Sequence, residues 1–213
     1  MKKILFILIL CFSTTVNSET ITAKSWVVVD NGKIVNGQNT SEIRSIASIT
    51  KLMTSIVYLD AHKKFGIPIN HDILQRALVS SDNNAARKLC DTYPGGKFEC
   101  INMMNLRAKE LGLINTKFLE PTGLSVFNTS TAEELIKIVL EASKYEEIVS
   151  ASHVRKKNTN PTIGKYDYDV SKTGFINIAG GCIVAKVKDR IVVLLGSKSV
   201  KTRIPELEKL LQM

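Results

Sequence analysis

The stretch Arg44-Ser45-Ile46-Ala47-Ser48-Ile49-Thr50-Lys51-Leu52-Met53-Thr54 places a serine and a lysine three residues apart at the start of a helical pattern. Apolar residues then recur at one-turn spacing to about Ala61, which predicts a helix with one apolar face formed by Ile49, Leu52, Met53, Ile56 and Val57. Ser48 and Lys51 are neighbours on an adjacent face of that helix. Unpaired N–H groups in a first helical turn favour negative charge, so Ser48 is a candidate nucleophile.

Lys51 is the candidate base for this serine, because only a neutral lysine can accept its proton. Lowering a lysine pKa from ~10.4 to near ~7 requires roughly 4–5 kcal/mol of differential stabilisation. Burial and a second nearby cation are the usual means. The alternative is an ordinary amphipathic helix with a solvated Lys51 and a capping serine.

Strand patterns lie at both ends of the chain and helical patterns lie between them. Residues 26–29 and 34–35 flank an Asn31-Gly32 turn, which indicates a hairpin. Three further strands are expected at 169–176, 182–187 and 190–195. Helices are expected at 73–79, 103–111, 205–211 and, after a capping box at 130–133, as two helices to about 152. These patterns predict an α+β fold in which both chain ends build an antiparallel sheet, flanked by helices, with an inserted mostly helical lobe.

The first 18 residues resemble a signal peptide. Lys2 and Lys3 precede an apolar run from Ile4 to Phe12, and Ser18 is a suitable last residue before cleavage. We therefore expect an exported protein of the periplasm or extracytoplasmic cell wall, with one domain over residues 19–213. Without the two lysines the net charge of +9 becomes +7, and the lysines are scattered, which argues against nucleic-acid binding.

The cysteines and histidines give little sign of a metal site. After the signal peptide three cysteines remain, and Cys90 and Cys100 flank a Tyr93-Pro94-Gly95-Gly96 turn, so the two could form a disulfide. Cys182 lies in an apolar run and is expected to be a buried thiol. The three histidines have no ligand spacing, so neither a metal nor another cofactor is expected.

A second polar cluster precedes a helical pattern at residues 80–84. Ser81 offers a hydroxyl and Asn83 a carboxamide two residues later, although the same residues would also suit a helix-capping loop. A third motif, Lys172-Thr173-Gly174, lies in an expected strand.

Ser48-Ile49-Thr50-Lys51, Ser81-Asp82-Asn83 and Lys172-Thr173-Gly174 together resemble the S-x-x-K, S-x-N and K-T-G motifs of penicillin-binding proteins and serine β-lactamases. Further stretches resemble the low-molecular-mass penicillin-binding proteins, which are D-alanyl-D-alanine carboxypeptidases and endopeptidases. The resemblance implies a serine DD-peptidase acting on peptidoglycan peptides, with β-lactams as covalent inhibitors.

The resemblance also implies a role for each motif residue. Ser48 would be acylated, Lys51 would take its proton, and Ser81 would pass a proton to the leaving amine. Asn83 would hold the substrate amide and orient Lys51, and Lys172 and Thr173 of the Lys172-Thr173-Gly174 motif would bind the terminal carboxylate. The backbone N–H groups of Ser48 and Phe175 would form the oxyanion hole.

The chain departs from this family in two places. Only 29 residues, Leu52 to Ser80, separate the first two motifs, and family members commonly have more. The chain also ends at Met213 without the additional C-terminal domain of common carboxypeptidases, so no stable membrane anchor is expected after signal cleavage.

Two rival functions remain. A class A-like β-lactamase would need a deacylating glutamate in an E-x-x-L-N loop; Glu120 lies in the right interval, but Gly123 and Leu124 replace the leucine and asparagine. The other rival is a non-hydrolytic β-lactam-sensing or cell-wall-binding domain. The sequence does not choose between carboxypeptidase and endopeptidase, nor does it give the oligomeric state.

Overall fold

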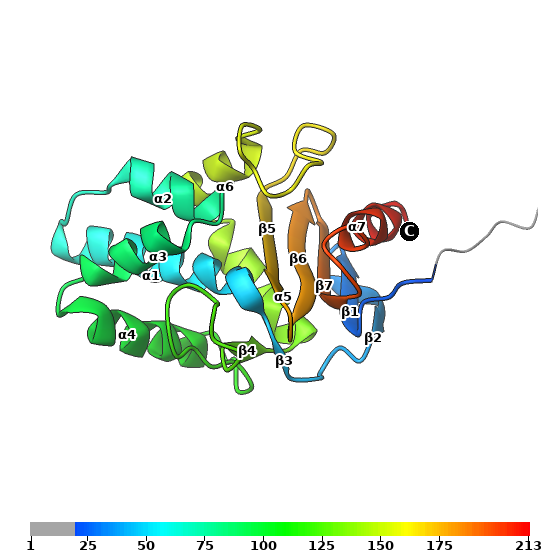
Figure 1. The fold of residues 1–213 in the computed structure, drawn as a ribbon, viewed down its shortest axis with the longest axis horizontal. Coiled ribbons are helices and arrows are strands. Elements are labelled where there is room, and N and C mark those ends of the chain that lie inside the picture. The colour runs from blue at the N-terminus through cyan, green and yellow to red at the C-terminus, as the bar shows by residue number, and fades with distance from the viewer. Residues whose placement is uncertain (1–19) are drawn as a thin grey trace, which may run out of the picture.

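A computed structural model describes residues 20–213, so the predicted signal peptide lies outside the described residues. The predicted α+β fold is confirmed: a five-stranded antiparallel sheet has strands from both chain ends, and a helical region lies beside it (Figure 1). The sheet has the order β2-β1-β7-β6-β5 and comprises β1 (Ser25–Asp30), β2 (Lys33–Gln38), β5 (Val170–Ile176), β6 (Gly180–Val187) and β7 (Arg190–Ser197).

Alternation along the strands divides the sheet into two buried faces. Val27 and Val29 of β1 belong to the larger core, whereas Trp26 and Val28 belong to a smaller core on the other face. Helix α5 (Ala132–Ala142) covers the first face and α7 (Arg203–Gln212) covers the second. The edge strand β5 faces the helical region (Figure 1).

The helical region comprises α1 (Thr50–Phe65), α2 (His71–Leu78), α3 (Asn83–Asp91), α4 (Gly96–Glu110) and α6 (Glu146–His153). A separate short sheet pairs β3 (Arg44–Ser45) with β4 (Thr129–Ser130) in antiparallel fashion. Within the described part of the chain, no helix combines the length and apolar character needed to cross a membrane.

Helix α1 differs from the predicted amphipathic helix. It is buried on nearly all sides, including the polar residues Thr50, Lys51, Thr54 and Ser55. A one-face pattern was expected because these polar residues resemble a solvated face in the sequence. They are buried because α1 is the central helix, with α2, α3, α4 and α5 packed around it.

Two helix starts also differ from the predicted positions. Helix α4 begins at Gly96 rather than near Met103, since Gly95 adopts the left-handed conformation that permits the chain to enter the helix directly after the turn. Helix α5 begins at Ala132, one residue later than a helix capped by Ser130 would begin. The capping residue is Thr131, whose hydroxyl accepts the hydrogen bond from the Glu134 N–H.

Candidate active site

Ser48 lies in a short 3₁₀ turn, η1 (Ala47–Ile49), that leads directly into α1, and Lys51 lies in the first turn of that helix. Lys51 Nζ is 2.9 Å from Ser48 Oγ, 2.9 Å from Asn83 Oδ1 and 2.6 Å from the backbone oxygen of Thr122. The structure therefore brings three of the predicted site residues together. Thr122 was not predicted, because its contribution is a backbone carbonyl that any residue could supply.

Burial lowers the pKa of Lys51 from 10.5 to about 8, against the opposing effect of Glu120 and Asp82 and with a smaller contribution from Arg87. Burial, together with the charges of Lys51 and Arg203, holds the pKa of Lys172 well below its ordinary value.

The second and third motifs meet where the helical region adjoins β5. Lys172 Nζ donates to Ser81 Oγ and to the backbone oxygen of Thr173, each at 2.9 Å. Lys172 and Thr173 are buried, and the Thr173 hydroxyl donates to the Thr159 hydroxyl at 2.6 Å. Thr159 was missed because a threonine in a polar run between expected elements carries no distinguishing pattern.

Two glycines leave space beside the backbone nitrogen of Ser48. A Cβ on Gly174 would lie 2.9 Å from this nitrogen, and a Cβ on Gly123 would lie 2.8 Å from it and 1.9 Å from the Ala47 carbonyl oxygen. The β5 strand and the Gly123 loop can therefore approach the start of η1 only because neither residue has a side chain. The side chain of Phe175, which follows Gly174, is exposed.

Two residues of the site have a backbone conformation that is unusual for residues with side chains. Ala47, which precedes Ser48, has φ +46°, and Ser81 has φ +58°. Non-glycine residues rarely occupy this left-handed region, and strain of this kind is concentrated at functional sites. Ala47 is also completely buried.

The carboxylate of Glu120 is occupied by its own loop. Its Oε2 accepts from the Thr122 N–H and hydroxyl at 2.7 and 2.6 Å, and its Oε1 accepts from the Gly123 N–H at 2.6 Å, the Asn128 amide at 3.0 Å and the Ser125 N–H at 3.3 Å. This loop holds the Thr122 carbonyl against Lys51.

Cys90 and Cys100 are joined in a disulfide between α3 and α4, with their Cα atoms 5.3 Å apart, and Cys182 is a buried free thiol. No group of three or more His, Cys, Asp or Glu residues within 20–213 is arranged to hold a metal ion.

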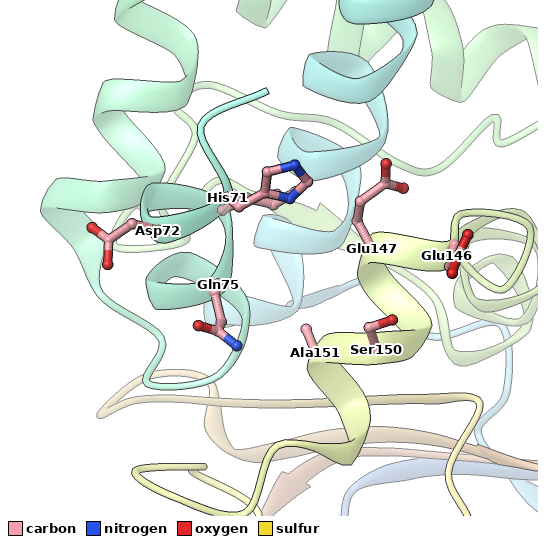
Figure 2. A pocket seen from close by; sticks show the side chains of 8 residues that line it. His71, Asp72, Gln75, Glu146, Glu147, Ser150 and Ala151 are labelled. Atoms are coloured by element: carbon pink, nitrogen blue, oxygen red, sulfur yellow. The ribbon is translucent and has the colours of Figure 1, made fainter. Parts of the chain in front are cut away.

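A separate cavity of about 610 Å³ lies between α2 and α6 (Figure 2). It is lined by His71, Asp72, Leu74, Gln75, Glu146, Glu147, Ser150 and Ala151. None of these is a predicted site residue, so the cavity lies apart from the Ser48 cluster.

Comparison with known proteins agrees with this geometry. The sequence matches the family described as D-alanyl-D-alanine carboxypeptidase over residues 12–73 and 68–198. The two matched stretches overlap at residues 68–73, which span the end of the α1–α2 connection and the first turn of α2 and lie within the segment that is short in this sequence.

Among curated proteins, the chain is 35% identical to the D-alanyl-D-alanine endopeptidase of Escherichia coli, over 82% of this chain and 70% of the relative. It is 34% identical to that of Pseudomonas aeruginosa, over 74% of this chain and 64% of the relative. In fold it is similar to penicillin-binding protein D2 from Listeria monocytogenes in an ampicillin-bound form, with TM-score 0.82 and 24% identity over 91% of this chain and 97% of the other.

Proposed function

This chain belongs to the D-alanyl-D-alanine carboxypeptidase family of serine peptidases, and we propose that it hydrolyses D-alanyl-D-alanine peptides of peptidoglycan through an acyl-enzyme on Ser48. The observation that carries the proposal is the set of three oxygen atoms around Lys51 Nζ. Removal of a terminal D-alanine and cleavage of a cross-link give different products, which distinguish the two activities.

The three oxygens match the hydrogen-bonding capacity of a neutral lysine. The oxygens of Asn83 and Thr122 can only accept, so they take the two N–H bonds of a neutral amine. The remaining lone pair then points at Ser48 Oγ, 2.9 Å away. With a pKa of about 8, roughly a tenth of Lys51 is neutral at pH 7. Lys51 is thus both available and oriented as the general base.

In the proposed reaction, Ser48 Oγ attacks the carbonyl carbon of the scissile amide while its proton passes to Lys51. The backbone N–H groups of Ser48 and Phe175 stabilise the resulting oxyanion. The space left by Gly123 and Gly174 supports this assignment, because a side chain at either position would crowd the Ser48 nitrogen.

The leaving group and the substrate carboxylate are assigned to the second and third motifs. Ser81, hydrogen-bonded to Lys172, gives its hydroxyl proton to the leaving amine as the C–N bond breaks, and the proton that Lys51 took from Ser48 replaces it, so that Lys51 and Ser81 both return to their starting protonation. Lys172 and Thr173 bind the terminal carboxylate. Asn83 binds the substrate amide and also accepts the hydrogen bond from Lys51. Water then hydrolyses the ester and regenerates the Ser48 hydroxyl.

The β-lactamase alternative is not favoured, because rapid deacylation needs a carboxylate that is free to activate a water molecule. The Glu120 carboxylate instead accepts five hydrogen bonds from its own loop. The presence of the proposed base, nucleophile and relay also disfavours a domain that only senses β-lactams or binds the cell wall.

The proposed place of action is the cell envelope. Residues 1–18 have the charge and apolar pattern of a signal peptide, and peptidoglycan is the substrate of the proposed reaction. We therefore place the processed protein in the periplasm or extracytoplasmic cell wall.

Purified protein incubated with peptidoglycan fragments, followed by mass spectrometry of the products, tests the proposal. Loss of one terminal D-alanine from monomers identifies a carboxypeptidase, and conversion of cross-linked dimers to monomers identifies an endopeptidase. The Ser48→Ala variant is the matched control and is expected to give neither product. Product formation by this variant, or none by the unmodified protein, would contradict the proposal.

A further inference from the structure

Thr159 links two parts of the site that come from different regions of the chain. It lies in the segment between α6 and β5, and its hydroxyl is 2.6 Å from that of Thr173. Its backbone N–H donates to the Val79 carbonyl at 3.1 Å, two residues before Ser81. Thr159 therefore contacts both the strand that carries Lys172 and the segment that carries Ser81.

The segment around Thr159 is firmly held by its two asparagine neighbours. Asn160 donates to the Ser171 hydroxyl at 2.8 Å and accepts from the Thr162 N–H and hydroxyl at 3.1 and 2.7 Å. Asn158 accepts from the Asn160 N–H at 2.9 Å. The short contact between the two threonine hydroxyls is thus held by a partly buried hydrogen-bond network.

The contact determines which of the two hydroxyls donates its hydrogen to the other. Each hydroxyl has one hydrogen, and at 2.6 Å only one hydrogen lies between the two oxygens. In the present arrangement Thr173 is the donor and Thr159 the acceptor. A carboxylate can only accept hydrogen bonds. When a substrate carboxylate binds at Thr173, the Thr173 hydroxyl therefore donates its hydrogen bond to the carboxylate instead of to Thr159.

We propose that Thr159 is a positioning residue for carboxylate recognition: its hydroxyl rotates to donate to Thr173 Oγ1 when Thr173 donates to the substrate carboxylate. The chain of two hydrogen bonds polarises the Thr173 hydroxyl and strengthens its bond to the anion. The inference rests on the proposed function, in which Thr173 binds that carboxylate.

Ligand binding tests the inference separately from turnover. In a Ser48→Ala background, the Kd is measured for an N-acetylated peptide ending in D-alanyl-D-alanine and for its C-terminal amide. Thr159→Val keeps the side-chain shape but removes the hydroxyl, and we expect it to raise the Kd of the carboxylate peptide by about fivefold, the effect of one ordinary hydrogen bond. The Kd of the amide should change by less than about twofold, because hydrogen bonds to neutral groups are weaker.

Two further variants separate positioning from folding. Thr159→Ser restores a hydroxyl and should recover the binding of the carboxylate peptide. Thr162→Val removes another hydroxyl of the same segment, which bonds to Asn160 and Tyr168, so it should lower the melting temperature without changing the ratio of the two Kd values.

Equal weakening of both ligands by Thr159→Val, or failure of Thr159→Ser to recover binding, would overturn the inference. So would a Ser48→Ala parent that binds peptide and amide alike, because no carboxylate site would then exist. An unmodified protein that binds the carboxylate peptide preferentially but releases no product would contradict the proposed function alone.

Discussion

The side-chain nitrogen of Lys172 lies 2.9 Å from the Ser81 hydroxyl, although the two residues are 91 positions apart in the sequence. This contact joins β5 to the loop between α2 and α3. Burial, followed by the charges of Lys51 and Arg203, holds the pKa of Lys172 well below its ordinary value. A bound anion would oppose this effect and raise the pKa of Lys172, so the charge of this lysine depends on the ligand.

Lys172→Ala should therefore affect substrates that carry a free carboxylate more than neutral ones. The lost interaction is charge-assisted for a carboxylate, and such hydrogen bonds are roughly twice as strong as neutral ones. The measurement is kcat/KM for a peptide ending in D-alanyl-D-alanine and for its C-terminal amide. An equal fall for the two substrates would remove the carboxylate-binding role from Lys172.

The acylation rate should rise with pH, because Lys51 acts as a base only after it has lost its proton. With a pKa of about 8, the second-order rate constant for acylation by benzylpenicillin should increase about tenfold per pH unit below 8 and become level above it. Lys51→Ala should lower this rate by at least ~10²–10⁴-fold. A rate that stays constant from pH 6 to 8 would mean that another group accepts the proton.

Benzylpenicillin should form a persistent adduct on Ser48, because the Glu120 carboxylate is occupied by its own loop. A missing deacylating base that raises the barrier by about 4 kcal/mol would lengthen the adduct lifetime roughly a thousandfold. Intact-protein mass spectrometry should detect the adduct for many minutes. Rapid multiple turnover without an adduct would instead indicate a β-lactamase.

Gly174→Ala should impair acylation by displacing the nucleophile. The new Cβ would lie 2.9 Å from the Ser48 nitrogen, 3.0 Å from the Ala47 Cβ and 3.1 Å from the Ile46 carbonyl oxygen, so η1 or β5 must shift. Misplacement of reacting groups by about 1 Å can lower rates about a hundredfold, which is the expected fall in the acylation rate. Circular dichroism checks that the variant is folded, and a folded variant with normal acylation would show that this close approach is unimportant.

The disulfide between Cys90 and Cys100 should stabilise the helical region. Closing a loop of about ten residues contributes roughly 2–3 kcal/mol in the loop-entropy description. The Cys90→Ser, Cys100→Ser double variant should therefore unfold at a lower urea concentration than the unmodified protein. Thiol titration of the unreduced, denatured protein without residues 1–18 should find one free thiol, that of Cys182, and three would contradict the bond.

The sequence was sufficient where a function needs a particular side chain at a particular spacing. Ser48 and Lys51 are three residues apart in one helix, so their contact follows from helical geometry alone. The strands were predictable because their alternating or continuously apolar residues match the two faces of the sheet.

The remaining features depend on tertiary contacts that have no local pattern. Thr122 acts through its backbone oxygen, and Glu120 is distinguished from a deacylating base only by the five hydrogen bonds that it accepts. The all-round burial of α1 depends on its neighbouring helices. The burial that lowers the pKa of Lys51 and of Lys172 likewise depends on the surrounding chain, which spacing cannot give.

Because η1 continues directly into α1, two steps of the proposed reaction depend on different parts of the structure. Ser48 and Lys51 belong to one unbroken helical segment, so their separation is fixed within a single rigid body. Ser81 and Lys172 belong to different bodies, the helical region and the sheet edge. A small hinge movement between these bodies would therefore leave nucleophile activation intact while it interrupts proton delivery to the leaving amine. Fluctuations that separate the helical region from β5 to admit a bulky substrate would slow amide cleavage more than attack on a strained ring, whose opening releases no separate amine product.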